Sequence, residues 1–466
     1  MRSARFFAAL AVLAVLSACA DGSPTSPTAG SVHARRPNII LLLADDQRWD
    51  ALGAAGNPII QTPNMDRLAR QGVYFTNSYV TSPVCMISRA SMFTGQWARR
   101  HGVLDFDTDF GAEAWAESYP VLLRAAGYHS AFLGKFGVGD NPPAGSFDFW
   151  RGFAGQGVYE HTDSAGRPIH LTQLLANQAV EFLQRQSPDT PFVLSLSFKA
   201  PHPQDEDPRQ FIVDPADAGL YAGVTIPASP TGDDTYWQRL PAFFRADNMA
   251  RDRWQTLFGT PELYQNSVKG YYRLVTGMDR AVGQILGALA RLHLDDNTVV
   301  VYTSDNGFFL GDHGMAHKWY GYEESVRVPL IVYDPRQPAS ERGRRDDRIA
   351  LNVDVAPTLL DLAGVAAPAR MQGSSLVPVL RNRATSWRTD FLFEEMYPHP
   401  QIPRSAGVVG GRYKYLRYVD PQPNYEMLFD LQTDPHETVD LAHDPAYAAV
   451  LDTMRRRYED LVAAAK

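Results

Sequence analysis

The sequence has little of what marks several large classes of protein. Basic residues are not in excess, because 44 Lys and Arg face 52 Asp and Glu and give a net charge of −8. This balance argues against a broad nucleic-acid-binding surface, so any bound anion must be met by local positive groups. Only two cysteines, Cys19 and Cys85, occur in 466 residues. Beyond the extreme N-terminus no apolar run is long enough to suggest a membrane span. With 45% hydrophobic and 21% charged residues, the composition is that of a globular protein with a large core.

The N-terminus reads as an export signal. Residues 1–18 combine Arg2 and Arg5 with an apolar stretch and small residues, which predicts a signal peptide. The segment Leu16-Ser17-Ala18-Cys19 resembles the bacterial lipobox, in which the cysteine becomes a lipidated N-terminus. We therefore expect an exported bacterial lipoprotein in the periplasm or outer membrane, held to the membrane by lipid on Cys19. A plain signal peptide cut nearby is the alternative, and residues 19–35 are expected to be a flexible tether.

Strand-like apolar runs alternate with helical patterns along the main part of the chain. Each run is followed by polar residues where it ends. The runs and their ends are Asn38 to Leu43 before Asp45-Asp46, Tyr128 to Leu133 before Gly134-Lys135, Phe192 to Phe198 before Lys199 and His202, and Thr298 to Tyr302 before Asp305-Asn306. Helical periodicity covers Thr172 to Leu183 and Gly270 to Leu292. The pattern predicts an α/β fold, with a large, mostly parallel mixed sheet sandwiched by helices. Such sheets bind ligands at the carboxyl ends of their strands, so the polar groups should converge.

The character of the sequence changes after about residue 380. Short strand-like runs and a final helix from Pro445 to Ala464 predict a smaller α+β unit of antiparallel strands and a helix. We therefore divide the chain into a catalytic α/β domain at residues 36–380 and a C-terminal subdomain at residues 381–466. The stretch from Pro203 to Pro261, rich in Asp, Pro and aromatics, reads as long loops over the site.

Oxygen-bearing side chains at two strand ends suggest a metal site. Asp45, Asp46, Asp305 and Asn306 offer the hard donors that Ca²⁺ or Mg²⁺ prefers. An Asp-Asp pair after a strand is also common as a helix cap or a turn. Carboxylates crowded together without a cation would repel one another and raise their pKa values, and a metal is the simplest relief.

The segment around Cys85 resembles a known family signature. Cys85, Arg89 and the following Thr94-Gly95 are similar to the C-x-P-S-R and T-G-R signature of the formylglycine-dependent sulfatases, within the alkaline-phosphatase-like superfamily. The likeness extends over nearly the whole chain after the tether. Further matching segments are Pro37 to Asp46, Thr62 to Ala69, Tyr302 to Gly307, His317-Lys318, Tyr322 to Ser325, Val328 to Leu330 and Leu428 to Glu437. The stretch Gly155 to Tyr159 resembles a segment of glycan sulfatases that act on N-acetylglucosamine.

The resemblance implies a set of site residues and a cofactor. A formylglycine-generating enzyme would oxidise Cys85 to formylglycine, whose hydrate is the nucleophile. The implied Ca²⁺ ligands are Asp45, Asp46, Cys85, Asp305 and Asn306. Arg89 would steady the hydrate and Asp305 would activate it. Lys135, His202 and Lys318 would bind the sulfate ester, with His202 protonating the departing alcohol.

Two positions depart from the family pattern. Ile87 stands where the signature has the proline that the modifying enzyme reads, which leaves open that Cys85 stays a thiol. Gly137 stands where many members have a histidine that assists release of sulfate. His101 or an ordered water is the expected substitute.

Three functions remain in view from the sequence. The first is hydrolysis of sulfate esters, on a sulfated carbohydrate or an aryl sulfate, by a calcium-dependent sulfatase. The second is a phosphoester or phosphonate hydrolase, because sulfate and phosphate esters differ more in charge than in shape. The third is a non-catalytic, surface-anchored receptor for sulfated polysaccharide, which Ile87 and Gly137 favour.

Overall fold

A computed structural model describes residues 35–466 of the chain. Residues 36–466 form one compact unit. The expected signal peptide at residues 1–18, Cys19 and all of the expected tether except Arg35 lie outside the described residues. Within the described part, no helix combines the length and the apolar composition needed to cross a bilayer.

A large mixed sheet forms the centre of the molecule. Its strand order is β13-β2-β12-β9-β1-β8-β4-β5. The five strands from β9 to β5 are parallel to their neighbours, whereas β12 runs antiparallel to both β9 and β2. The bounds are β1 (Asn38–Asp45), β2 (Val73–Phe75), β4 (His129–Lys135), β5 (Phe149–Phe153), β8 (Phe192–Pro201), β9 (Thr298–Ser304), β12 (Leu330–Tyr333) and β13 (Arg344–Asp346). The predicted mostly parallel sheet is therefore confirmed.

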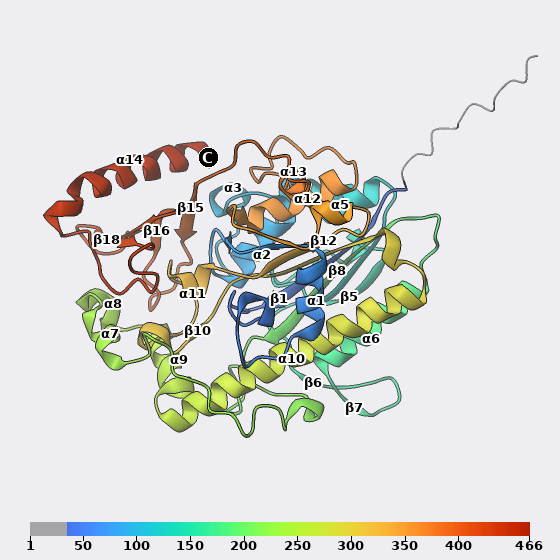
Figure 1. Cartoon of the computed structure of the whole chain (residues 1–466), viewed down its shortest axis with the longest axis horizontal. Helices are drawn as coiled ribbons and strands as arrows, with labels where there is room; N and C mark the ends of the chain where they lie inside the picture. The colour runs from blue at the N-terminus through green and yellow to red at the C-terminus, as the bar shows by residue number, and fades with distance from the viewer. Residues whose placement is uncertain (1–34) are drawn as a thin grey trace, which may run out of the picture. The chain divides into compact units, whose positions relative to one another are not determined.

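Helices cover both faces of this sheet (Figure 1). All eight residues of β1 are buried, and alternate residues face opposite sides. Ile40 and Leu42 pack in one core with α1 (Pro63–Gln71), α6 (Leu171–Gln184) and α10 (Pro261–Arg291). Ile39 and Leu41 pack in the other core with α2 (Cys85–Thr94), α5 (Tyr119–Ala125) and α12 (Val355–Leu362). Burial on both faces explains why the strand reads as an unbroken apolar run.

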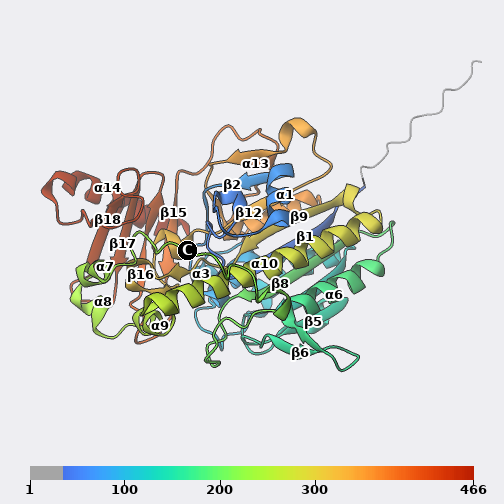
Figure 2. The ribbon, with the colours of Figure 1, turned by 60° about the horizontal axis from the view of Figure 1, so that its bottom comes forward.

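An antiparallel sheet with a helix follows towards the C-terminus (Figure 2). Its four strands are β15 (Asp390–Glu395), β16 (Ser405–Gly410), β17 (Tyr413–Tyr418) and β18 (Tyr425–Asp430). The final helix α14 (Ala448–Ala464) packs on the same sheet through Leu451, beside Tyr415 and Leu428. The antiparallel strands and the helix are confirmed, whereas a domain boundary at residue 380 stays a prediction.

The stretch from Pro203 to Pro261 contains more helix than its composition predicted. It holds α7 (Asp234–Arg239), α8 (Ala242–Ala246) and α9 (Met249–Phe258). The polar residues that suggested loops are helix caps, because Asp233 accepts from Thr235 N and Asn248 accepts from Ala250 N. The remaining short elements are β3 (Ser78–Tyr79), β6 (Glu160–Thr162), β7 (Pro168–His170), β10 (Phe309–Leu310), β11 (Ala316–His317), β14 (Ala350–Leu351), α3 (Ala98–His101), α4 (Ala112–Ala116), α11 (Glu323–Val326) and α13 (Val377–Leu380).

Candidate active site

Three carboxylates meet at the carboxyl end of the large sheet. Asp45 ends β1, Asp46 follows it, and Asp305 follows β9. Because β1 and β9 are parallel neighbours with Ala44 opposite Ser304, their ends deliver these side chains to one place. One oxygen of each carboxylate lies within 4.8 Å of the others. All three side chains are completely buried, and the Asp46 N–H donates to Oδ1 of Asp305 at 3.1 Å.

Asn306 completes this group, which we call the acidic corner (Asp45, Asp46, Asp305 and Asn306). Its side-chain amide donates to Oδ1 of Asp46 at 2.5 Å. Among the described residues, no donor meets Oδ1 of Asp45, Oδ2 of Asp46 or Oδ1 of Asn306, although all are buried. Buried acceptors without donors, close together and all oxygen, fit a hard divalent cation. The acidic corner is therefore suited to the metal that the sequence predicted.

Cys85 lies at the edge of the acidic corner, as the first residue of α2. Its sulfur, a carboxylate oxygen of Asp45 and a ring nitrogen of His202 lie within 4.8 Å of one another. Burial raises the pKa of the Cys85 thiol, although Lys135 and Lys318 oppose the shift. The side chain is only 1% exposed. The sulfur therefore lies close to Asp45, and the role of both residues as metal ligands stays a prediction.

Arg89 lies one helical turn after Cys85 and contacts the acidic corner. Its Nε donates to Oδ2 of Asp305 at 2.7 Å, and Nη1 donates to the Lys135 carbonyl at 2.6 Å. Nη2 lies 3.4 Å from Oδ2 of Asp45 and has no hydrogen-bond partner in the described part of the chain. Arg89 therefore orients two of the carboxylates and keeps one N–H group free for residue 85 or a bound anion.

Lys135 and Lys318 line the corner with positive charge. Lys135 Nζ donates to Oδ2 of Asp45 at 2.5 Å and to Gln156 Oε1 at 2.6 Å. Lys318 Nζ donates to Oδ1 of Asp46. Each ammonium has three donors, so neither lysine is saturated by these contacts. Both lysines therefore lie at the acidic corner, and their role in binding an anion stays a prediction.

His202 faces the corner from the end of β8. Its Nδ1 lies 2.6 Å from the Pro203 carbonyl, which assigns the Nδ1 proton to that bond. Its Nε2 lies 3.6 Å from Oδ2 of Asp46. Burial and the neighbouring Lys318 hold the pKa of His202 well below its usual value of 6.5. The ring is therefore neutral in this environment and presents the unprotonated Nε2 to the site.

Crowding splits the acidities of the carboxylates. Burial raises the pKa of Asp46 to about 7, with Asp45 and Asp305 adding to the shift. Burial and Asp45 also raise the pKa of Asp305. Burial alone would raise the pKa of Asp45 as well, but Lys135, Arg89 and Lys318 overcome it and lower the pKa to about 2. The expected upward shift holds for two carboxylates and fails for Asp45, because only at Asp45 does the attraction of the cations outweigh burial.

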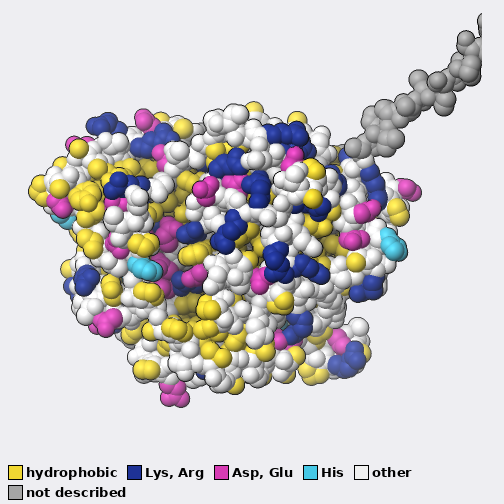
Figure 3. Space-filling model, in the orientation of Figure 1, with side chains coloured by type: hydrophobic (Ala, Val, Ile, Leu, Met, Phe, Trp, Pro, Cys, Tyr) yellow, Lys and Arg dark blue, Asp and Glu magenta, His cyan; other side chains and the backbone are white. Residues whose placement is uncertain are grey.

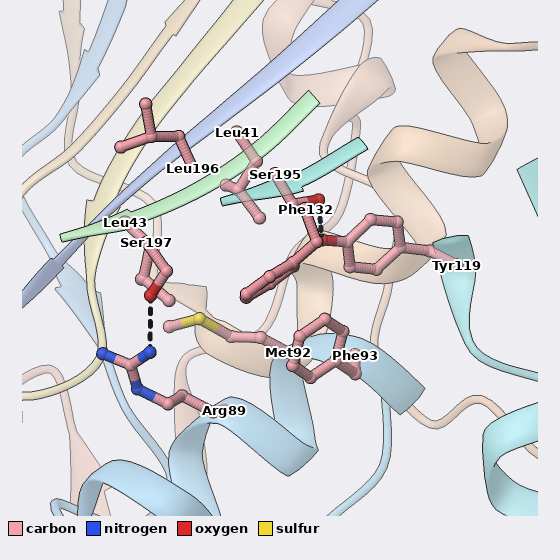
Figure 4. A pocket seen from close by; sticks show the side chains of 10 residues that line it. All are labelled: Leu41, Leu43, Arg89, Met92, Phe93, Tyr119, Phe132, Ser195, Leu196 and Ser197. Atoms are coloured by element: carbon pink, nitrogen blue, oxygen red, sulfur yellow. Dashed lines mark hydrogen bonds between the residues drawn. The ribbon is translucent and has the colours of Figure 1, made fainter. Parts of the chain in front are cut away.

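A small hollow lies on the far side of Arg89, between α2 and the large sheet (Figure 4). It measures about 10 Å³, and its walls are mostly Leu, Met, Phe and Tyr side chains. At the polar edge, Arg89 Nη1 donates to Ser197 Oγ at 2.5 Å. This volume suits at most one water molecule. The hollow is therefore too small to hold a substrate.

The sequence reasoning missed Lys199 and Gln156 as site residues. Lys199 is 1% exposed on β8 and lies with its Nζ 5.1 Å from the centre of the Tyr159 ring. Burial and the nearby Lys135 lower the pKa of Lys199 to about 8. Each residue had a sequence feature that could have identified it. Lys199 is a charged residue inside a buried strand, and Gln156 lies in the segment that resembled glycan sulfatases.

A second pair near the site was also missed. His317 Nε2 lies 3.6 Å from Oδ1 of Asp205, and neither atom has a hydrogen-bond partner among the described residues. The His317 ring is 6.0 Å from the His202 ring and stacks on Trp319 at 5.4 Å. Asp205 belongs to a segment without family resemblance, so no sequence signal linked the two.

The two departures from the family pattern have clear structural settings. Ile87 is completely buried in the first turn of α2, where a helix has no intrahelical acceptor for its N–H groups. Gly137 has φ +72°, and a Cβ there would lie 2.8 Å from Cδ of Arg89. His101 does not replace the missing histidine, because its ring nitrogens lie 3.1 Å from Ser91 Oγ and from the Val103 N–H. The buried carboxylates of the acidic corner and the positively charged side chains beside them nonetheless suit an anionic ester held by a metal ion.

Comparison with known proteins identifies the family. The family described as Sulfatase matches residues 37–365, and N-sulphoglucosamine sulphohydrolase, C-terminal, matches residues 311–464. The chain therefore belongs to the sulfatase family, as its signature around Cys85 predicted, and it is a sulfuric ester hydrolase. N-acetylglucosamine-6-O-sulfatase of Bacteroides thetaiotaomicron is 28% identical and aligns with 96% of this chain and 90% of its own length. The arylsulfatase of Clostridium perfringens is 28% identical over 90% of this chain and 93% of its own.

Solved structures share the fold. One, in complex with its substrate D-glucosamine-2-N,6-O-disulfate, superposes with a TM-score of 0.80 at 28% identity, over 92% of this chain and 98% of that chain. The phosphonate monoester hydrolase of Agrobacterium radiobacter reaches a TM-score of 0.77 at 23% identity, over 92% and 96% of the two chains. The second likeness concerns the fold alone.

Proposed function

We propose that this sulfatase removes sulfate from an amino-sugar unit of a sulfated glycan, with Cys85 oxidised to formylglycine and Ca²⁺ at the acidic corner. The observation that carries the proposal is the convergence of Cys85, the acidic corner, two lysines and a histidine from separate segments of the chain. The choice of sugar is supported by relatives named for N-acetylglucosamine and by the neighbour bound to a sulfated glucosamine.

The calcium ligands in this proposal are Asp45, Asp46, Asp305 and Asn306, together with residue 85. When present, the ion and the oxidised side chain supply electrostatic stabilisation of the sulfate oxygens and the nucleophile. Asp305 is the base that takes the proton of the nucleophile. Arg89 orients Asp305 through its 2.7 Å contact and presents its free Nη2 to residue 85.

The cationic side chains bind and orient the ester. Lys135 and Lys318 each have N–H donors beyond those given to Asp45 and Asp46, and these donors can hold two sulfate oxygens. Because the Pro203 carbonyl fixes the proton on Nδ1 of His202, Nε2 is the atom that carries the proton to the departing alcohol. The bound anion favours the protonated form of this ring, which burial otherwise disfavours.

The decisive experiment combines mass analysis of residue 85 with an aryl sulfate assay. The protein is made with and without a formylglycine-generating enzyme, and the peptide with Cys85 is weighed in each preparation. We expect turnover in proportion to the formylglycine fraction. Full turnover by unmodified protein would contradict the proposed nucleophile. Binding of sulfated polysaccharide without turnover, at a high formylglycine fraction, would instead establish the receptor that Ile87 and Gly137 favour.

A matched pair of substrates tests the sulfate preference. The same aryl group is offered as its sulfate and as its phosphate, so that only the transferred group differs. We expect the sulfate to react faster, since the corner offers two lysines and no further divalent cation site for the second phosphate charge within the described residues. Faster phosphate turnover would support a phosphoester hydrolase instead.

The location of the protein is part of the same proposal. A lipid on Cys19 would hold the catalytic unit at the periplasmic side or on the outer membrane, close to imported or external glycans. Expression of the full chain and of Cys19→Ser in a Gram-negative host, followed by membrane fractionation and labelling with a fatty-acid probe, tests this. Equal membrane recovery and equal labelling of both proteins would refute the lipid anchor.

A further inference from the structure

A second pocket, which shares no lining residue with the acidic corner, lies between α11, segment 48–50 and the C-terminal sheet. We call it the seam pocket, and it has a volume of about 550 Å³. Segment 48–50, α11 and the turn of β16 at Gly410-Gly411 contribute to its walls. In Figure 3, acidic side chains gather on this face over α11. None of the proposed catalytic or metal-binding residues lines the pocket.

The charges in the seam pocket do not balance. Asp50, Asp312, Glu323 and Glu324 line it, against only two basic side chains, Arg48 and Arg327. Three of the four carboxylates form an ion pair with an arginine or a lysine. The pairs are Asp50 with Arg48 at 2.5 Å, Asp312 with Arg48 at 2.7 Å, and Glu323 with Lys414 at 2.9 Å.

Glu324 is the exception among these carboxylates. It is 6% exposed, and its Oε2 has no hydrogen-bond partner in the described part of the chain. The nearest ionisable group across from it is His313, whose Nε2 lies 4.0 Å from Oε2 and is also without a partner. A buried carboxyl in this state costs free energy, which a bound cation would recover.

The size and arrangement of the pocket select the kind of cation. A divalent metal needs several oxygen ligands close together, and in residues 35–466 the only such groups lie at the acidic corner. In the seam pocket the other carboxylates are engaged with guanidinium or ammonium groups, so Glu324 alone is available. The volume is that of a small-molecule site and far exceeds an ion.

We propose that the seam pocket binds a small organic cation, a hydroxylated primary amine of about monosaccharide size, with its ammonium group on Glu324. The engaged carboxylates and guanidinium groups of the wall accept from and donate to the hydroxyl groups. Burial and the neighbouring Asp312 raise the pKa of Glu324 well above 4.5, and an ammonium ion restores its charge as Lys414 does for Glu323. Anionic sulfated sugars are repelled by the same acidic wall.

Trp49 and Tyr79 give the pocket its rigid side. The guanidinium of Arg327 lies 4.2 Å from the Trp49 ring centre and 6.0 Å from that of Tyr79. Tyr79 OH also donates to Glu323 at 3.2 Å. These contacts hold the wall in place without engaging Glu324, so the pocket is formed before a ligand arrives.

Calorimetric titration of the whole protein with glucosamine, at a pH below the pKa of its amine, tests the proposal. We expect a Kd on the order of 1 mM, a typical affinity for one charged contact and several hydroxyl contacts. N-acetylglucosamine, which keeps the ring but lacks the charge, should bind at least about tenfold more weakly. Equal affinity for the two sugars would overturn the proposal.

Two variants locate the binding. Glu324→Gln keeps the shape of the side chain and should weaken glucosamine at least about tenfold, whereas the exposed Glu262→Gln should not. Gly411→Phe obstructs the pocket while leaving Glu324 intact, and a Cβ at Gly411 meets no atom within 4 Å. Glucosamine binding that survives both pocket variants would place the ligand elsewhere. Calcium binding that Glu324→Gln removes would show a metal site instead. Neither outcome depends on turnover, so the proposed sulfatase chemistry stands or falls separately.

Discussion

Two buried clusters of carboxylates in this protein follow opposite designs. In the acidic corner, Asp45, Asp46 and Asp305 place their oxygens within 4.8 Å of one another, and acceptor atoms remain unpartnered among the described residues. In the seam cluster, formed by Glu323, Glu437 and Lys414, the ammonium of Lys414 lies 2.9 Å from one carboxylate and 2.7 Å from the other. The corner leaves buried oxygen atoms available to a bound ion, whereas in the seam cluster one ammonium of the chain contacts both carboxylates.

The difference teaches how burial of charge serves function in one place and architecture in another. A buried ion pair contributes little net stability compared with apolar packing, but removing one partner is costly. In the seam cluster the chain supplies both partners, and Lys414 on β17 ties α11 to the C-terminal sheet. In the corner the chain also supplies cations, namely Arg89, Lys135 and Lys318. Oxygen atoms of Asp45, Asp46 and Asn306 nonetheless lack a donor among the described residues, and a bound ion can meet them.

The largest expected effect is on catalysis. Asp305→Ala removes one corner oxygen pair and the partner of Arg89, so we expect kcat/KM on an aryl sulfate to fall by at least about 1000-fold. Calcium affinity should fall as well, as measured by titration calorimetry. Asp295→Ala, which changes an exposed residue beyond the end of α10, serves as the control. Similar activity in the two variants would remove the functional distinction between the corner and other acidic residues.

The next largest effect is on the free energy of unfolding and concerns the seam cluster. Lys414→Met leaves Glu323 and Glu437 buried without their cation, which should lower the free energy of unfolding by about 3–5 kcal/mol. Urea denaturation measures this change, and Lys269→Met on α10 is the half-buried lysine control. The folded fraction should retain kcat, because Lys414 does not contact the corner. Loss of kcat at unchanged stability would mean that the two clusters are not separate.

A smaller effect concerns the pH dependence of stability at Glu324. Burial and Asp312 raise its folded pKa above the usual 4.5, so the protonated form is the one that folding favours. Its contribution is complete below the unfolded pKa and is lost as pH rises towards the folded value. Glu324→Gln should therefore match wild type in acid and exceed its free energy of unfolding at about pH 8, by roughly 1–3 kcal/mol, the usual cost of a buried polar group without a partner. Denaturation curves across this pH range that stay parallel for the two proteins would contradict the prediction.

The smallest effect on the fold is expected at Ile87. Ile87→Pro suits the first turn of α2, which needs no N–H donor there, and loses only part of a buried side chain, at a cost of about 1 kcal/mol. If the modifying enzyme requires proline, mass analysis should show a higher formylglycine fraction in the variant. The conservative Ile87→Val, which loses a similar packing volume, should leave the fraction unchanged. An unchanged fraction in both would mean that residue 87 does not limit modification.

Much of the corner could be predicted because its residues stand at strand ends. Asp45 and Asp305 follow apolar runs, and the parallel pairing of those runs brings them together without any further information. Lys199 was noted at a strand end but not assigned to the site, because a single lysine gives no periodicity and its burial depends on neighbouring strands. The stretch around Asn248 was read as loop because helix caps and turns use the same residue types.

The seam could not be predicted for a different reason. Glu323 and Glu324 are adjacent in sequence and identical in type, yet one is paired and the other is not. The distinction depends on Lys414 and on the position of β17, which come much later in the chain. No local pattern carries this information, because the pairing is decided when α11 packs against the C-terminal sheet.

If Cys85 is oxidised as proposed, its burial limits when a modifying enzyme can reach it. Cys85 is 1% exposed, and Asp305 and Lys318, two of the charged groups near its thiol, are synthesised long after it. The formylglycine-generating enzyme would then have access to that thiol only while the later segments are still missing or unfolded. The fraction of active protein would then depend on how fast Cys85 is oxidised in the unfolded chain compared with how fast the later segments fold. Slowing translation or export should therefore yield more active molecules.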